Sequence, residues 1–153
     1  MHEEEAAPMF GNLLRAPAEA LNKRILAALA DAGFTDLRPA HPTVFQHLPS
    51  TGARATTLAE RAQMTKQSMG ELVDYLVRAG YLERGADPSD GRATIIRRTA
   101  RGWEVERLAR ATIAAVESEW GAALGVERLL ACQQFLADLG VLLAEPTAAP
   151  VTQ

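Results

Sequence analysis

The sequence predicts a mainly α-helical protein that contains one small β-hairpin. Two observations predict this class. Apolar residues recur every three or four positions over most of the chain, and only one pair of short β-prone runs interrupts them. Alanine and leucine are abundant, which also favours helix. With 153 residues the chain is long enough to bury a core. We expect one unit over about 10–143, with flexible tails over 1–8 and 145–153.

The first predicted helix covers about 10–32, where apolar residues are spaced three, four and seven positions apart. Pro17 is expected to kink or restart this helix, and Gly33 to end it. A short helix through Leu48 follows. Pro42 suits its first turn, because the N–H group that proline lacks has no partner there.

A helix-turn-helix is predicted next. A helix of about seven residues around Leu58 is followed by a tight connection over 63–65. The second helix covers 65–79, with Thr65 as its N-cap and Gly80 after its end. Its apolar residues follow the i, i+3, i+4, i+7, i+8 pattern, so one face is buried. Two helices of this length joined by so short a turn are typical of a helix-turn-helix.

A hairpin, or wing, is predicted directly after these helices. The β-prone runs 81–84 and 94–98 lie on either side of the turn sequence GADPSDGRA. Two long helices are expected after the wing, over 100–123 and 126–143, with Gly125 between them.

The helix over 65–79 carries the groups that bind nucleic acids. Its first turns hold a capping hydroxyl, a cation, an amide and a second hydroxyl, which can contact phosphates and base edges. A glycine inside the helix would let it lie deeper in a groove. The alternative is an ordinary solvated face, with the glycine admitting a neighbouring helix. The candidate DNA-binding residues of this helix are Thr65, Lys66, Gln67, Ser68, Gly70 and Glu71.

The wing supplies a second candidate contact. Asp90-Gly91-Arg92 places a guanidinium at the hairpin tip, and Asp90 is close enough to hold the Arg92 side chain. Arginine is favoured in a narrow, electronegative minor groove. A lone exposed arginine usually has no function, but a tip of this kind directly after a helix-turn-helix is more specific. Arg97 is a further candidate at the wing.

The charge distribution agrees with a polyanionic partner. The formal net charge is −3, but residues 54–101 hold nine basic and six acidic residues, a balance of +3. The rest of the chain therefore carries −6. Such an asymmetry can orient the protein toward a polyanion.

The order LAERAQMTKQSMGELVDYLVRAGYLERGADPSDGRATIIRRTARG closely resembles the MarR family of winged helix-turn-helix regulators. The resemblance covers about 10–143 and is most specific over 57–102. It implies a winged helix-turn-helix over about 38–99 and a helical dimerisation region over about 10–33 and 100–143. The helix over 65–79 would enter the major groove and Arg92 the minor groove.

The resemblance also implies partners. These are a second copy of the chain, as a homodimer, and double-stranded DNA with a pseudo-palindromic site. One position departs from the family. Arg98 precedes Thr99 where the family usually has leucine, so we expect a more basic and less tightly packed wing base.

Many members of the family bind small aromatic molecules between the dimerisation and winged regions. Four residues lie in segments that could border such a cleft, although core packing is the preferred interpretation: Phe34, His41, Phe45 and Trp103. Cys132 is expected to be a buried, inert thiol. His41 and His47 lack partners at metal-ligand spacing, so no metal is predicted.

The sequence therefore predicts a cytoplasmic, DNA-binding transcription regulator, in most cases a repressor. It contains no catalytic motif, phosphate-binding glycine loop or membrane span, so we expect neither an enzyme nor a cofactor. The alternative is a winged-helix module that contacts proteins and does not bind DNA.

Overall fold

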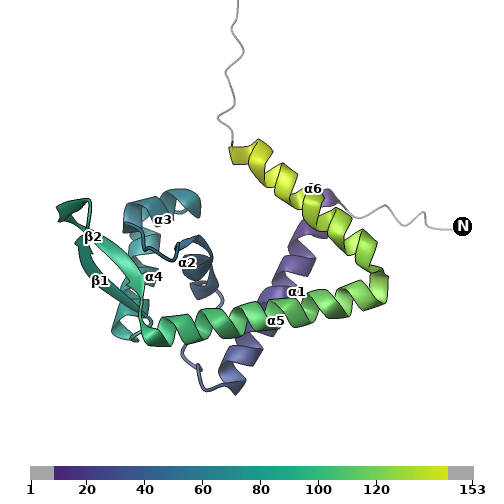
Figure 1. Cartoon of the computed structure of the whole chain (residues 1–153), viewed down its shortest axis with the longest axis horizontal. Helices are drawn as coiled ribbons and strands as arrows, with labels where there is room; N and C mark the ends of the chain where they lie inside the picture. Colours follow the sequence, from purple (N-terminus) through teal and green to yellow (C-terminus); the bar gives the residue numbers. More distant parts are fainter. Residues whose placement is uncertain (1–8, 145–153) are drawn as a thin grey trace, which may run out of the picture. The chain divides into compact units, whose positions relative to one another are not determined.

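The computed structural model describes residues 9–144, and the predicted tails lie outside these residues. The described residues divide into two compact units between Ile113 and Ala114, and we describe these separately as the N-terminal unit and the C-terminal unit. Figure 1 shows the elements. In chain order they are α1 (Phe10–Asp31), α2 (His41–His47), α3 (Ala55–Arg61), α4 (Lys66–Arg78), β1 (Leu82–Asp87), β2 (Asp90–Arg98), α5 (Ala100–Leu124) and α6 (Val126–Ala144). The predicted fold class, mainly helical with one hairpin, is confirmed.

The helix-turn-helix is formed by α3 and α4. In the connection, Gln63 adopts a left-handed conformation with a φ of 52°. Thr65 caps α4, because its Oγ1 accepts a hydrogen bond of 3.1 Å from the amide of Ser68. The inward face of α4 is completely buried at Met69 and Val73. Burial of such side chains contributes about 1.5–3 kcal/mol each, which fixes the opposite face toward solvent.

The wing is longer than the sequence indicated. β1 and β2 pair antiparallel, with Leu82 opposite Arg98, and only Pro88 and Ser89 lie between the strands. Most of GADPSDGRA was expected to be turn, but it forms strand. Near the base of the wing, Ala53 adds a β-bridge to Ile96, so a third backbone segment supports β2 there.

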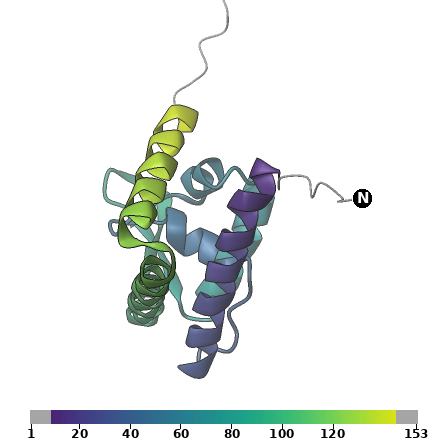
Figure 2. The same ribbon diagram turned by 90° about the vertical axis from the view of Figure 1, so that its right-hand side faces the viewer.

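The core of the N-terminal unit joins the winged elements to α1 and α5. α1 contributes Ile25 and Leu29, and α5 contributes Val105. Figures 1 and 2 show α1 beside α2, and α5 beginning at the base of the hairpin. The helix does not restart at Pro17: α1 is continuous through it. The residues around Pro17 are exposed, so the carbonyl that loses its helical partner faces water.

The C-terminal unit contains α6, none of whose described residues is buried. The expectation of a buried Cys132 was wrong, since this thiol is exposed in the single chain. The neighbouring leucines cannot bury it, because they are themselves largely exposed. Among residues 9–144, no helix is long and apolar enough to cross a membrane. The same residues contain no cluster of three or more metal-binding side chains.

Candidate nucleic-acid interface

The first turn of α4 presents polar groups to solvent. Lys66, Gln67 and Ser68 are all exposed. The Gln67 amide nitrogen donates to the Glu71 carboxylate at 3.2 Å, and the amide oxygen of Gln67 has no hydrogen bond to any residue that the structure describes. With the dipole of the helix N-terminus, this turn offers a cation, an amide and hydroxyl groups at one place.

Gly70 lies on the same outward face. A Cβ atom built on Gly70 would meet no atom within 4 Å outside its own helix backbone. Packing against the residues that the structure describes therefore does not require glycine at this position. The expectation that the helix lies deeper in a groove at Gly70 stays a prediction.

The tip of the wing carries an unpaired guanidinium. Arg92 is exposed, and its side chain has no hydrogen bond or ion pair with any residue that the structure describes. Asp90 does not hold this side chain as expected. Its Oδ1 accepts instead from the backbone amide of Arg92 at 3.2 Å, while its Oδ2 lies 3.5 Å from Arg54 NH2. The Arg92 guanidinium thus remains free for an external anion.

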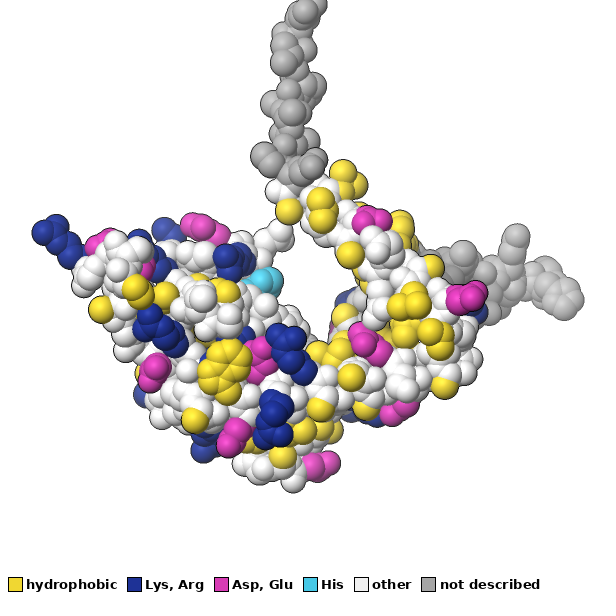
Figure 3. All heavy atoms as spheres, in the orientation of Figure 1, with side chains coloured by type: hydrophobic (Ala, Val, Ile, Leu, Met, Phe, Trp, Pro, Cys, Tyr) yellow, Lys and Arg dark blue, Asp and Glu magenta, His cyan; other side chains and the backbone are white. Residues whose placement is uncertain are grey.

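Other arginines of the basic segment have internal partners. Figure 3 shows Lys and Arg side chains around the hairpin, with acidic side chains among them. Arg84 pairs with Asp74 of α4. Arg101 donates to the Tyr81 hydroxyl at 3.0 Å and lies over the Tyr81 ring, 4.6 Å from its centroid. The segment's charge of +3 therefore overstates the number of cations available to a ligand.

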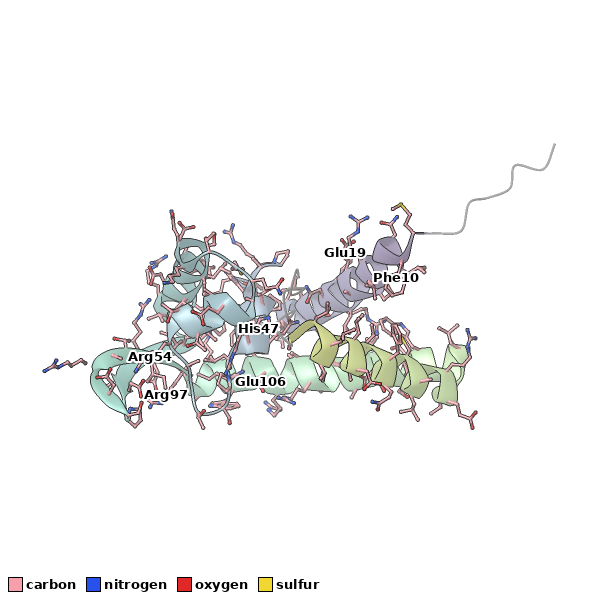
Figure 4. The ribbon with its side chains drawn as sticks, turned by 90° about the horizontal axis from the view of Figure 1, so that it is seen from above. Phe10, Glu19, His47, Arg54, Arg97 and Glu106 are labelled. Carbon is pink, nitrogen blue, oxygen red and sulfur yellow. The ribbon has the colours of Figure 1, made fainter. Side chains whose placement is uncertain are left out.

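Arg97 lies along the hairpin. Its side chain is half-buried, and Cβ atoms built on Gly52 and Gly85 would lie 2.9 Å from it. Figure 4 labels Arg97 and Arg54 at the hairpin. The Arg97 guanidinium thus lies over Gly85 of β1. The role of Arg97 in DNA binding stays a prediction.

Arg98 is buried, so the expectation of a loosely packed wing base was wrong. Its guanidinium donates to three carbonyl oxygens: Phe45 at 2.8 Å, Leu48 at 2.7 Å and Pro49 at 3.1 Å. These carbonyls belong to the C-terminal end of α2 and the residues after it, where helix carbonyls lack helical partners. Arg98 therefore joins the end of β2 to the end of α2.

The charge of Arg98 is balanced by α5. Its Nε pairs with Glu106, and its guanidinium carbon lies 4.9 Å from the centroid of the Trp103 ring. Burial lowers the pKa of Arg98, and the Glu106 carboxylate opposes that effect. Glu106 also accepts from Arg110, at 2.8 Å. The result is a row of three charges in which Glu106 of α5 lies between Arg98 of β2 and Arg110 of α5.

A pocket of about 650 Å³ lies beside this row, within the N-terminal unit. Most of its lining is apolar and comes from α1, α2 and α5. Its charged side chains are Arg98, Glu106 and Arg110. Three of the four predicted ligand-binding residues line it: His41, Phe45 and Trp103. The fourth, Phe34, is not among the lining residues and packs against Tyr81 at a centroid distance of 6.1 Å.

His41 is held rigidly in the pocket wall. Its Nδ1 accepts from the amide of Arg38 at 3.0 Å, and its ring stacks on Tyr75 of α4 at 4.6 Å. Burial lowers the pKa of His41, and the nearby Arg38 charge lowers it further. The ring is therefore neutral at pH 7, with its proton on Nε2.

Comparison with known proteins gives one family match. The MarR family model matches residues 35–93, which include the helix-turn-helix and most of the wing. This part of the chain is similar to the MarR family. No match was found among curated protein sequences.

Several solved structures have the same fold. CouR from Rhodococcus jostii RHA1, bound to p-coumaroyl-CoA, is 22% identical with a TM-score of 0.66, covering 84% of this chain and 90% of that one. CouR bound to a 23-mer DNA duplex is also 22% identical with a TM-score of 0.66, covering 86% and 92%. MarR from E. coli is 16% identical with a TM-score of 0.66, covering 87% and 98%.

Sequence reasoning missed two functional groups of this chain. Arg54 binds the carboxylates at the wing tip, and Arg98 holds the end of α2. Their partners lie 33 and about 50 residues away in the sequence, and no local spacing indicates either contact. The departure from leucine at position 98 was a signal, but it did not reveal that the arginine is buried.

Proposed function

We propose that the chain is a homodimeric, sequence-specific DNA-binding transcription regulator that acts as a repressor and is released by a small-molecule effector. One observation carries the DNA-binding part. Among the described residues, the first turn of α4 and the Arg92 guanidinium make no ion pair, while the neighbouring Arg84 and Arg98 pair with acidic side chains. Such a helix suits the major groove, and such an arginine suits the minor groove.

Exposed apolar surface supports dimerisation. At the start of α1 and along α6, large apolar side chains remain exposed in the single chain. Surfaces of this kind mark interfaces, and a two-fold dimer buries the same surface of both copies. The exposed residues are Met9, Phe10, Leu13, Leu14, Leu130, Phe135, Leu136, Val141, Leu142 and Leu143. A two-fold dimer would read a pseudo-palindromic site, with half-sites about 34 Å apart.

The pocket supports an effector. Its volume of about 650 Å³ suits a small molecule, and its lining is mostly apolar with a few polar groups. CouR, which has the same fold, has been solved with p-coumaroyl-CoA. His41 and Arg98, which both line the pocket, would be polar contacts for an apolar ligand.

The test is to sequence duplex fragments retained by the purified protein, and then to measure affinity for a retained duplex by fluorescence anisotropy. Arg92→Ala should cost about 1–3 kcal/mol of binding free energy and lower the salt dependence by about one counterion. Arg107→Ala, which removes an exposed arginine of α5, is the control. Retention of no duplex would favour the alternative, a winged module for protein contacts.

Dimerisation and the sign of regulation have separate measurements. Light scattering should give twice the chain mass of 16.5 kDa. Phe135→Glu should shift the dimer toward monomer, because a charge then enters an apolar interface. Gln134→Glu adds the same charge at a neighbouring exposed position and is the control. A reporter behind the retained site should be repressed by the wild-type protein, and activation would overturn that part of the proposal.

A further inference from the structure

Arg54 connects the helix-turn-helix to the wing. It is the N-cap residue of α3. The preceding residue, Ala53, exchanges two backbone hydrogen bonds with Ile96 of β2, at 3.1 and 2.8 Å. The backbone at Arg54 is therefore fixed to both α3 and the wing strand.

The Arg54 side chain reaches the far end of the hairpin. Its Nε donates to Asp87 Oδ2 at 2.9 Å, and its NH2 lies 2.8 Å from the same oxygen. The NH2 group also lies 3.5 Å from Asp90 Oδ2. Asp87 is the last residue of β1 and Asp90 is the first of β2. One guanidinium thus holds both ends of the turn.

The same two carboxylates shape the turn. Asp87 Oδ1 accepts from the Ser89 amide at 2.9 Å and from its hydroxyl at 2.7 Å. Asp90 Oδ1 accepts from the amide of Arg92 at 3.2 Å. The Ser89 hydrogen bonds, followed by that from Arg54, lower the pKa of Asp87 to about 2, so this carboxylate is ionised at neutral pH. We call Arg54, Asp87 and Asp90 the wing clamp.

The wing needs such a contact because it is a ribbon of only two strands. Beyond the Ala53–Ile96 bridge, no third strand supports it among the described residues. Two-stranded hairpins are marginally stable by themselves. A mobile tip would lose conformational freedom when Arg92 bound DNA, and this loss would weaken binding.

We propose that Arg54 is a positioning residue that holds the wing tip against α3, so that Arg92 meets DNA in fixed register with α4. The role in DNA binding rests on the proposed function. Two other roles are possible for Arg54: a direct contact with a phosphate, or support of the fold as a whole. The experiment below separates them.

The first measurement uses the protein without DNA. The {1H}–15N heteronuclear NOE of residues 89–92 should be as high as that of β2 in the wild type and in Arg107→Ala. It should fall markedly in Arg54→Ala and Asp87→Asn, while the values in α4 stay unchanged. An unchanged NOE at the tip would overturn the clamp. A fall throughout the unit would show a role in the whole fold instead.

The second measurement is a double-mutant cycle on duplex affinity. Arg54→Ala should weaken binding about tenfold in the wild type and less than about twofold in an Arg92→Ala background, because a positioning residue acts through Arg92. Fold-changes that multiply would overturn the proposal and show that Arg54 contacts DNA itself. If the wild type binds no duplex, the proposed function fails and the role in DNA binding fails with it. The NOE then still reports whether Arg54 orders the tip.

Discussion

Replacing Arg98 by alanine should destabilise the N-terminal unit strongly. The side chains of Arg98 and Glu106 are only 3% and 14% exposed, so the ion pair lies almost entirely away from water. Removing one partner of a buried pair typically costs about 3–5 kcal/mol, because the other charge stays buried. Arg98→Ala also removes the donor to three carbonyl oxygens at the end of α2. We therefore expect Arg98→Ala to lower the free energy of unfolding by an amount in the upper part of that range.

The structure limits the loss in one way. Glu106 retains its contact with Arg110, whose side chain is 77% exposed, so the carboxylate keeps a partially solvated partner. Removing both members of the buried pair should accordingly cost less than the two single losses added together. The cycle of Arg98→Leu, Glu106→Leu and the double variant measures this coupling. Leucine fills part of the volume of the arginine side chain without adding a charge.

The assay is urea-induced unfolding, monitored by circular dichroism. The protein concentration is held fixed, because association of the folded chains would add to the apparent stability. Arg97→Ala is the matched control, because Arg97 is only half-buried and has no ion pair among the described residues. We expect this variant to lose at most about 1 kcal/mol of unfolding free energy. A loss below about 1 kcal/mol for Arg98→Ala as well would refute the reasoning, because the pair would then be effectively solvated.

Three further predictions follow from the site. Gly70→Ala should raise the free energy of unfolding by about 1 kcal/mol, because alanine favours helix and the added Cβ meets no neighbour. The same change should weaken duplex binding. Unchanged affinity would exclude a close approach of DNA to α4 at this position. Stability should fall as the pH drops below 6.5, because burial lowers the pKa of His41 in the folded state and protonation then favours the unfolded chain. In urea unfolding measured at several pH values, His41→Phe should lose this part of the pH dependence. Lys66→Ala and Gln67→Ala should each cost about 1–3 kcal/mol of binding free energy on the specific duplex and relax the preference for particular bases. An equal loss of affinity on all duplexes would indicate that these side chains contact phosphates instead.

The sequence predicts the helix-turn-helix well because its determinants are local. The period of Met69, Val73 and Leu76 defines the buried face of α4, and the Thr65 cap defines its start. Both signals lie within the helix itself or next to it. The outward position of Lys66 then follows from geometry alone.

The errors arise where distant residues decide the outcome. Arg98 resembles a surface cation in the sequence, but carbonyls about 50 residues earlier and Glu106 of α5 make its burial possible. The wing strands are longer than expected, with Asp87 and Asp90 at the strand ends held by Arg54 from the start of α3. Counting charges by segment likewise cannot separate internally paired arginines from free ones.

Two residues of the pocket wall connect the pocket to α4 and to the base of the wing. His41 in its wall stacks on Tyr75 of α4, and Arg98 in its wall joins the end of β2 to α2. A ligand changes DNA affinity only if it binds one arrangement of these elements more tightly than another. Filling the pocket would therefore act on α4 through the stacked rings and on the wing base through the guanidinium. The wing clamp lies at the opposite end of the hairpin, and none of its three residues lines the pocket. Loss of the clamp should then weaken DNA binding equally with and without ligand, whereas loss of the Arg98–Glu106 pair should change the ligand response itself.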